Sequence, residues 1–105
     1  MVNDITPTEL ALSLQSGDWH VLDVREDWER DIVALAQSIN IPLGEIPQRV
    51  SEIPTNKNLA VLCHGGVRSA QAAAFLVSAG LPQVYNVVGG IDRWAIDVEP
   101  DLPRY

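Results

Sequence analysis

The sequence predicts an α/β fold in which helices cover both faces of a central parallel sheet. Short apolar and β-branched runs alternate with helix-like stretches along the chain, which is the pattern of successive βα units. The run LAVLC at 59–63 is apolar at every position, as expected for a central strand whose two faces are both buried. With 105 residues the chain can build one hydrophobic core of ordinary size, so we interpret residues 1–105 as a single domain.

The first helix is predicted from its start signal. In the segment TPTE, Thr6 can cap the helix, Pro7 suits its first turn and Glu9 completes a capping box. Gly17 marks the end of this helix. Local patterns predict four more elements in this half of the chain: a strand at 20–24, a short helix within 25–36, a brief strand within 38–43 and a helix within 44–53.

The second half of the chain is predicted to hold a long helix between two central strands. The alanine-rich stretch from 70 to 80 is nearly all apolar, and its small side chains allow close approach to a sheet. We expect this helix to begin near Arg68 or Ser69, and Gly80 and Pro82 follow its end. The neighbouring elements are a strand at 59–63 before it, and a strand at 84–88 and a last helix within 89–97 after it.

Composition and charge narrow the function classes. An apolar fraction of 47% with 20% charged residues is typical of a soluble globular protein. The net charge of −7 argues against nucleic-acid binding, which needs clustered Lys and Arg to neutralise phosphates. Neither a signal peptide nor a membrane span is predicted, so we expect a cytoplasmic protein. The single cysteine cannot form an internal disulfide.

The stretch CHGGVRS at 63–69 contains the residues best suited to chemistry. It follows a predicted central strand and leads into a helix, which is where parallel sheets bind ligands. Gly65 and Gly66 allow the backbone to curl so that its N–H groups form a nest for an anion or a thiolate. The helix N-terminus adds its positive dipole end. We therefore predict that Cys63 is held as a thiolate nucleophile.

Arg68 supports a functional interpretation of this stretch. It is the only fully charged residue between Lys57 and Asp92. A cation at a helix N-terminus opposes the helix dipole, so we expect Arg68 to have no local partner until an anion binds. Its planar fork suits an oxyanion such as thiosulfate, sulfonate or phosphate. The alternative is that Cys63 is a small buried residue and Arg68 a surface cation, but the glycines and the helix start favour a site.

These residues resemble the rhodanese-like family of single-domain sulfurtransferases. The family's active-site loop has the form C-x-x-G-x-R followed by Ser or Thr, and residues 63–69 match this pattern. The similarity extends to LDVRE at 22–26, INIPLGEI at 39–46 and VYNVVGGIDRW at 84–94. The resemblance implies a rhodanese-like α/β fold, with a central parallel five-stranded sheet flanked by helices on both faces.

The resemblance also implies a reaction. Cys63 would take the outer sulfur of a small anionic donor such as thiosulfate and release sulfite. The persulfide would pass its sulfur to cyanide in an assay, or to a thiol acceptor in the cell, by analogy thioredoxin or glutathione. We expect ping-pong kinetics and no cofactor, with Arg68 binding the oxyanion of the donor. The other residues expected to hold the donor or the persulfide are His64, Gly65, Gly66, Val67 and Ser69.

Loop length separates sulfur transfer from related chemistries. The Cdc25-type phosphatases resemble this fold but place five residues between Cys and Arg, and arsenate reductases on this fold look like that longer type. Here four residues, His64 to Val67, lie between them, which favours a sulfur atom over a phosphoryl group. Two further alternatives are a relay module that passes persulfide sulfur between partner proteins, and a non-catalytic binding domain.

One segment departs from the family pattern. Many members carry a Gly-His pair and then Gly-Ala before the NIP strand, whereas this chain has Val33-Ala34 and Gln37 at these positions. His64 could favour the thiolate or point to solvent. With only His20 as a second histidine, the chain has no zinc-ligand spacing, and we expect no metal site.

Several residues near the loop are expected to have structural roles. Asp23 and Arg25 lie at the end of the stretch HVLDVRE, on the same sheet edge as Cys63. Asp23 could pair with Arg25 or cap a neighbouring loop. Gly89 and Gly90 are expected to let the last helix start close to the loop. Trp28 is a candidate rim residue because it follows the Asp23 strand.

Overall fold

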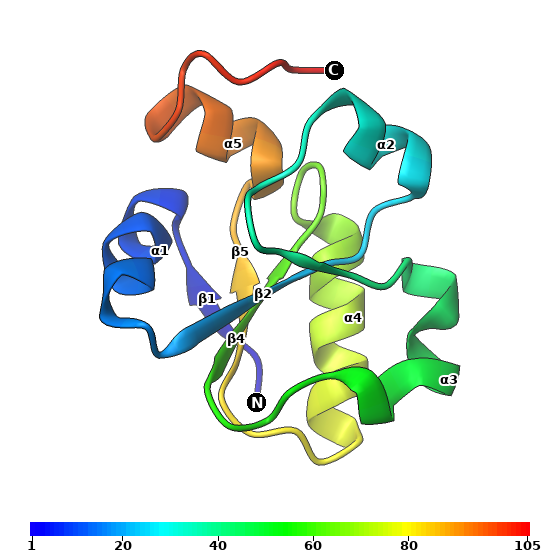
Figure 1. The fold of residues 1–105 in the computed structure, drawn as a ribbon. Coiled ribbons are helices and arrows are strands. Elements are labelled where there is room, and N and C mark those ends of the chain that lie inside the picture. The colour runs from blue at the N-terminus through cyan, green and yellow to red at the C-terminus, as the bar shows by residue number, and fades with distance from the viewer.

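The computed structural model describes residues 1–105 and contains one five-stranded sheet in which every strand pair is parallel. The strand order is β1-β5-β4-β2-β3, so the strands that precede and follow the longest helix are neighbours in the middle of the sheet (Figure 1). This confirms the predicted α/β class with a central parallel sheet. The strands are β1 (Asn3–Ile5), β2 (Trp19–Asp23), β3 (Ile39–Asn40), β4 (Asn58–Leu62) and β5 (Val84–Val87).

Helices cover both faces of the sheet. In Figure 1, α1 and α5 lie on one side of the strands and α3 and α4 on the other, while α2 lies beyond the strand ends. The longest helix has 12 residues, and none is long and apolar enough to cross a lipid bilayer. The helices are α1 (Pro7–Ser13), α2 (Asp27–Ile32), α3 (Ile46–Arg49), α4 (Val67–Ser78) and α5 (Gly90–Asp97), with 3₁₀ turns at Leu14–Ser16, Leu43–Glu45 and Val50–Glu52.

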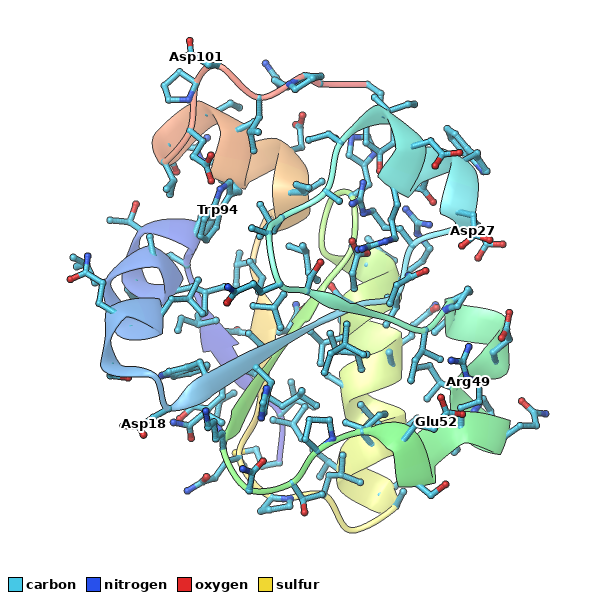
Figure 2. All side chains as sticks on the ribbon, in the orientation of Figure 1. Asp18, Asp27, Arg49, Glu52, Trp94 and Asp101 are labelled. Atoms are coloured by element: carbon cyan, nitrogen blue, oxygen red, sulfur yellow. The ribbon has the colours of Figure 1, made fainter.

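The core consists of two apolar clusters, one on each face of the sheet. Leu59 and Val61 of β4 point into the cluster beneath α3 and α4, whereas Ala60 and Leu62 point into the cluster beneath α1 and α5. Trp94 extends from α5 toward α1 in this second cluster (Figure 2). Alternate residues of a strand face opposite sides, so an uninterrupted apolar run is needed where both sides are covered. The prediction that this strand is buried on both faces is confirmed.

Local signals determine several element boundaries. The capping box at α1 forms as predicted, because the Glu9 N–H donates to Thr6 Oγ1 (3.2 Å) and the Thr6 N–H donates to Glu9 Oε1 (2.9 Å). Helix α4 begins at Val67, slightly before the predicted start. Strand β1 was not predicted, because its three residues include two polar ones and show no alternating pattern. It is a strand because it pairs along the edge of β5.

The carboxyl ends of the central strands meet at one edge of the sheet. Asp23 is the register partner of Leu62, so the chain leaves β2 and β4 side by side, and Cys63 follows Leu62 directly. Helix α5 starts against the same edge, where the Ile91 N–H donates to the Cys63 carbonyl (2.9 Å). A Cβ on Gly90 would collide with the backbone carbonyls of Cys63 and His64. The prediction that glycine lets the last helix start close to the loop is confirmed.

Candidate active site

Cys63 lies at the end of β4, at the base of the segment 63–69, which we call the cysteine loop. The residue is only 1% exposed. The backbone N–H of Gly66 donates to its Sγ (3.0 Å), and the Sγ–H group donates to Ser69 Oγ (3.2 Å). The Ser69 hydroxyl in turn donates to Asn86 Oδ1 (2.6 Å). The sulfur therefore has polar partners on one side, although Cys63 also belongs to an apolar core cluster.

The two glycines of the cysteine loop differ in their roles. Gly66 has φ +106°, in the left-handed region, and this turn aims its N–H at the sulfur. A Cβ at Gly66 would also lie 3.2 Å from the Gly89 backbone nitrogen. Gly65 has no positive φ, is exposed and has open space around it. Only Gly66 therefore has the curled conformation that was predicted for both, and it supplies the one backbone N–H that donates to Sγ.

Asn86 on β5 fixes the shape of the loop, and the sequence analysis did not identify it. Besides accepting from Ser69, its side-chain amide donates to the Gly66 carbonyl (3.4 Å). The side chain is thus bonded to Gly66 and Ser69, the two residues that hydrogen-bond to the sulfur. The available signal was a polar amide in the middle of the apolar run VYNVV, since buried polar groups require partners.

Arg68 has a local partner, so the prediction that it lacks one until an anion binds is wrong. Its Nη1 and Nη2 atoms donate to Oε1 and Oε2 of Glu29 at 2.6 and 2.8 Å. Glu29 comes from α2, 39 residues earlier in the chain, and its side chain is only 3% exposed. Arg68 lowers the pKa of Glu29 to about 2, and Glu29 raises the pKa of Arg68. The carboxylate is therefore ionised at neutral pH.

Tyr105 contacts the Arg68–Glu29 pair from the C-terminal segment. Its hydroxyl donates to Glu29 Oε2 (2.6 Å) and accepts from Arg25 Nη1 (3.0 Å). Its ring stacks on His64, with centroids 4.1 Å apart and planes at 15°. Burial is the main reason that its pKa is raised. In Figure 1 the C-terminal segment, drawn in red, runs from α5 across the end of the molecule toward α2, which brings Tyr105 to this cluster.

A buried ion pair is connected to Tyr105 through Arg25. Arg25 and Asp23 are both 0% exposed, and Arg25 Nη2 lies 2.8 Å from Asp23 Oδ2, so the predicted pairing is confirmed. Burial alone would lower the pKa of Arg25, but its bonds to Asp23 and Tyr105 outweigh burial and raise it. Arg30 adds a second contact to Asp23 Oδ2 (2.9 Å). These bonds fix the turn that leads into α2.

The remaining predicted residues form the rim of the site. Val67 is 72% exposed and Trp28 is 60% exposed, with the Trp28 ring in edge contact with Tyr105 at 6.0 Å. His64 is half-buried by its stacking on Tyr105, and its Nε2 lies 4.0 Å from Asp92 Oδ1. The side chains of His64 and Val67 make no hydrogen bond to the sulfur. These two residues could therefore hold a sulfur only through their backbone groups.

A cavity lies away from the cysteine loop. It has a volume of about 420 Å³ and is bordered by Trp19, Trp94 and Leu35, with none of its wall contributed by the cysteine loop.

In the segment that departs from the family pattern, Gln37 has a backbone conformation that favours glycine. Gln37 has φ +61°, the left-handed conformation that favours glycine, at the position where many family members carry glycine. Gln37 is exposed, so its side chain is free of crowding from the core in this conformation.

Sequence comparison identifies the family. The family model described as the rhodanese-like domain matches residues 6–97, which is most of the chain and includes the whole cysteine loop. The chain belongs to the rhodanese-like domain family. The parallel sheet, the position of Cys63 after β4 and the glycine-containing turn before α4 are all contained in the matched range.

Relatives of this rhodanese-like domain include sulfurtransferases. A protein named sulfurtransferase from Allochromatium vinosum is 35% identical over 96 residues, covering 90% of each chain. The adenylyltransferase and sulfurtransferase MOCS3 of Arabidopsis thaliana is 31% identical over 118 residues, covering 96% of this chain but only 25% of that protein. The crystal structure of a rhodanese-related protein from Thermoplasma volcanium matches with a TM-score of 0.82 and 37% identity, covering 96% of this chain and 95% of the other.

Proposed function

We propose that this rhodanese-like domain transfers a sulfane sulfur from thiosulfate or another persulfide donor to a thiol acceptor through a persulfide on Cys63. The observation that carries the proposal is the contact of 3.0 Å between the Gly66 N–H and Cys63 Sγ. A backbone N–H aimed at a sulfur stabilises negative charge on it, both on the attacking thiolate and on the persulfide. Membership in a family of sulfurtransferases and sulfur carriers agrees with this chemistry.

Loading is the first displacement. The Cys63 thiolate attacks the outer sulfur of thiosulfate, a new S–S bond forms, and the S–S bond of the donor breaks. Sulfite leaves with the electron pair, so no external oxidant is needed. Covalent capture on one nucleophile divides the transfer into two easier steps, and it gives ping-pong kinetics.

Discharge is the second displacement. An acceptor thiolate, such as that of glutathione or thioredoxin, attacks the outer sulfur of the persulfide and returns Cys63 as a thiolate. Cyanide does the same in an assay and leaves as thiocyanate. The Gly66 N–H then faces the departing charge on Sγ, which is where a hydrogen-bond donor accelerates this step.

The length of the cysteine loop favours sulfur over phosphorus. Four residues separate Cys63 from Arg68, and only one backbone N–H donates to the thiol. A phosphoryl group carries three equatorial oxygens that need several converging donors. A single outer sulfur needs fewer, so the short loop supports sulfur transfer rather than phosphate hydrolysis.

The test is the mass of the intact protein before and after incubation with thiosulfate. We expect the native chain to gain one sulfur atom and release an equal amount of sulfite, and cyanide to remove the sulfur as thiocyanate. Cys63→Ser should gain nothing. If the native chain gains no sulfur from thiosulfate or from a persulfide, or if Cys63→Ser gains as much, the proposal is wrong.

A further inference from the structure

We propose that Glu29, held in place by Tyr105, sets the donor specificity of Cys63 by occupying the Arg68 guanidinium. The domain would then take sulfur from a hydropersulfide borne by a thiol in preference to a dianion such as thiosulfate. This inference rests on the function proposed above, and it names the donor class for the same site.

The first argument is that the anion-binding fork is already filled. Both terminal nitrogens of Arg68 donate to the two oxygens of Glu29, at 2.6 and 2.8 Å. This is the bidentate geometry that an oxyanion of the donor would otherwise use. Thiosulfate can use this fork of Arg68 only by displacing a carboxylate whose side chain is 3% exposed.

The second argument is that Glu29 is held by more than Arg68. Each of its oxygens accepts a second hydrogen bond: Oε1 from the Glu26 N–H (3.1 Å) and Oε2 from the Tyr105 hydroxyl (2.6 Å). Loss of Arg68 to a donor would leave a buried carboxylate without its cation, which is strongly unfavourable. The arrangement therefore resists exchange of one anion for another.

The third argument is charge balance. Three guanidinium groups (Arg25, Arg30 and Arg68) face two carboxylates (Asp23 and Glu29) in one connected cluster, which leaves one positive charge. A Cys63 thiolate cancels that charge, and its field adds to the effect of Glu29 in raising the pKa of Arg68. The reactive site is then neutral as a whole, so it exerts no net attraction on a dianion.

A hydropersulfide avoids all of these obstacles. Its outer sulfur carries no oxyanion, so Arg68 and Glu29 stay paired while the Cys63 thiolate attacks. The S–S bond of the donor breaks, its thiolate leaves with the electron pair, and the proton of the outer sulfur moves with that sulfur to Cys63. The Gly66 N–H remains free to donate a hydrogen bond to Sγ of the persulfide.

The experiment compares two donors, glutathione persulfide and thiosulfate, by steady-state transfer to cyanide and by loading measured as intact mass. The native domain should show a higher kcat/KM with glutathione persulfide. Glu29→Gln keeps the size of the side chain and one of its two hydrogen-bond acceptors but removes the charge. It should lower the KM for thiosulfate about tenfold and narrow the ratio between donors, because one charged competitor for Arg68 is lost.

Two further variants separate this effect from a general loss of structure. Tyr105→Phe removes only the hydroxyl that holds Glu29, so it should lower the thiosulfate KM in the same direction and by a smaller factor. Asp31→Asn removes one charge from an exposed residue of α2 that makes no ion pair, and it should leave both donors unaffected. Thermal unfolding of each variant verifies that it is folded.

The outcomes distinguish the two proposals. If both donors load Cys63 but the thiosulfate KM stays the same in Glu29→Gln and in Tyr105→Phe, the specificity inference is wrong and the proposed function stands. The inference is equally overturned if the native domain prefers thiosulfate. If neither donor loads Cys63, the proposed function itself fails, and the inference fails with it.

Discussion

Gly66 is the residue whose backbone brings a donor to the sulfur. Its φ of +106° is strained for any residue with a side chain, and a Cβ would press on the Gly89 nitrogen at 3.2 Å. We expect Gly66→Ala to lower the free energy of unfolding by about 1–2 kcal/mol. It should also slow sulfur loading, because the N–H turns away from Sγ. Urea unfolding and loading followed by mass spectrometry measure the two effects.

Gly65 is the matched control for this substitution. It is exposed, has no positive φ and has open space where a Cβ would lie. Gly65→Ala should therefore change neither stability nor loading appreciably. Equal effects of the two substitutions would contradict the assignment of the loop conformation to Gly66.

Ser69 is predicted to assist the sulfur directly. The Ser69 residue is fully buried, and its Oγ accepts from the Cys63 Sγ–H group at 3.2 Å while donating to Asn86 Oδ1. Once Cys63 is a thiolate, the hydroxyl hydrogen can rotate from Asn86 to Sγ and stabilise the negative charge. We expect Ser69→Ala to slow loading by up to about tenfold, since one hydrogen bond is worth roughly 1 kcal/mol. Ser78→Ala, at the exposed end of the same helix, is the control. A Ser69→Ala variant that loads at the native rate would rule out a role for this hydroxyl.

At the scale of elements, the contact between α5 and the cysteine loop holds the site together. The Ile91 and Asp92 N–H groups donate to the Cys63 and His64 carbonyls at 2.9 and 3.1 Å, which requires the bare backbone of Gly90. Gly90→Ala combines a positive φ with a collision, and we expect it to destabilise the protein by about 3 kcal/mol. Chemical denaturation measures this value, and sulfur loading should slow in parallel.

Substitution of Gly80 measures the cost of backbone strain without a steric collision. It also has a positive φ, +97°, but nothing lies within 4 Å of a Cβ placed there. Gly80→Ala should cost about 1 kcal/mol, the strain alone. If Gly80→Ala and Gly90→Ala were equally destabilising, close approach of α5 to the loop would not be what Gly90 provides.

Elements whose signals are local were predictable from the sequence. The capping box of α1, the apolar strand β4 and the alanine-rich helix α4 each depend on neighbours within a few residues, and the structure contains all three. Strand β1 was missed because it exists only through its pairing with β5, 82 positions away at Asn3 and Tyr85. Pairing over that distance leaves no pattern in three residues.

The candidate site was predictable only in part, for the same reason. Cys63 and its loop are contiguous, so their spacing in the sequence describes the geometry. Glu29 is one of several charged residues within 25–31, and nothing local distinguishes the carboxylate that turns inward. Its partners Arg68 and Tyr105 lie 39 and 76 residues away. Periodicity in α2 could not identify it, because the helix has only six residues.

At the scale of the whole molecule, three separate segments meet above the sheet edge. Helix α2 provides Glu29, the cysteine loop provides Arg68, and the C-terminal segment provides Tyr105 (Figure 1). Each bond links segments far apart in sequence, so it forms only in the folded chain. The ionisation of Glu29 is therefore coupled to folding as a whole.

This coupling predicts how stability depends on pH. The folded state lowers the pKa of Glu29 from 4.5 to about 2, mainly through Arg68, so the stabilisation is complete above pH 4.5 and is lost as the pH falls toward 2. Between pH 5 and pH 3 we expect the native protein to lose about 2 kcal/mol of unfolding free energy through this group. Glu29→Gln has no such carboxylate, so its stability should fall less over the same interval. Urea unfolding at both pH values measures the difference, with Asp31→Asn as the charge-matched control. Equal losses in the native protein and in Glu29→Gln would mean that Glu29 is not bound to Arg68 in solution, which would also remove the basis for donor specificity.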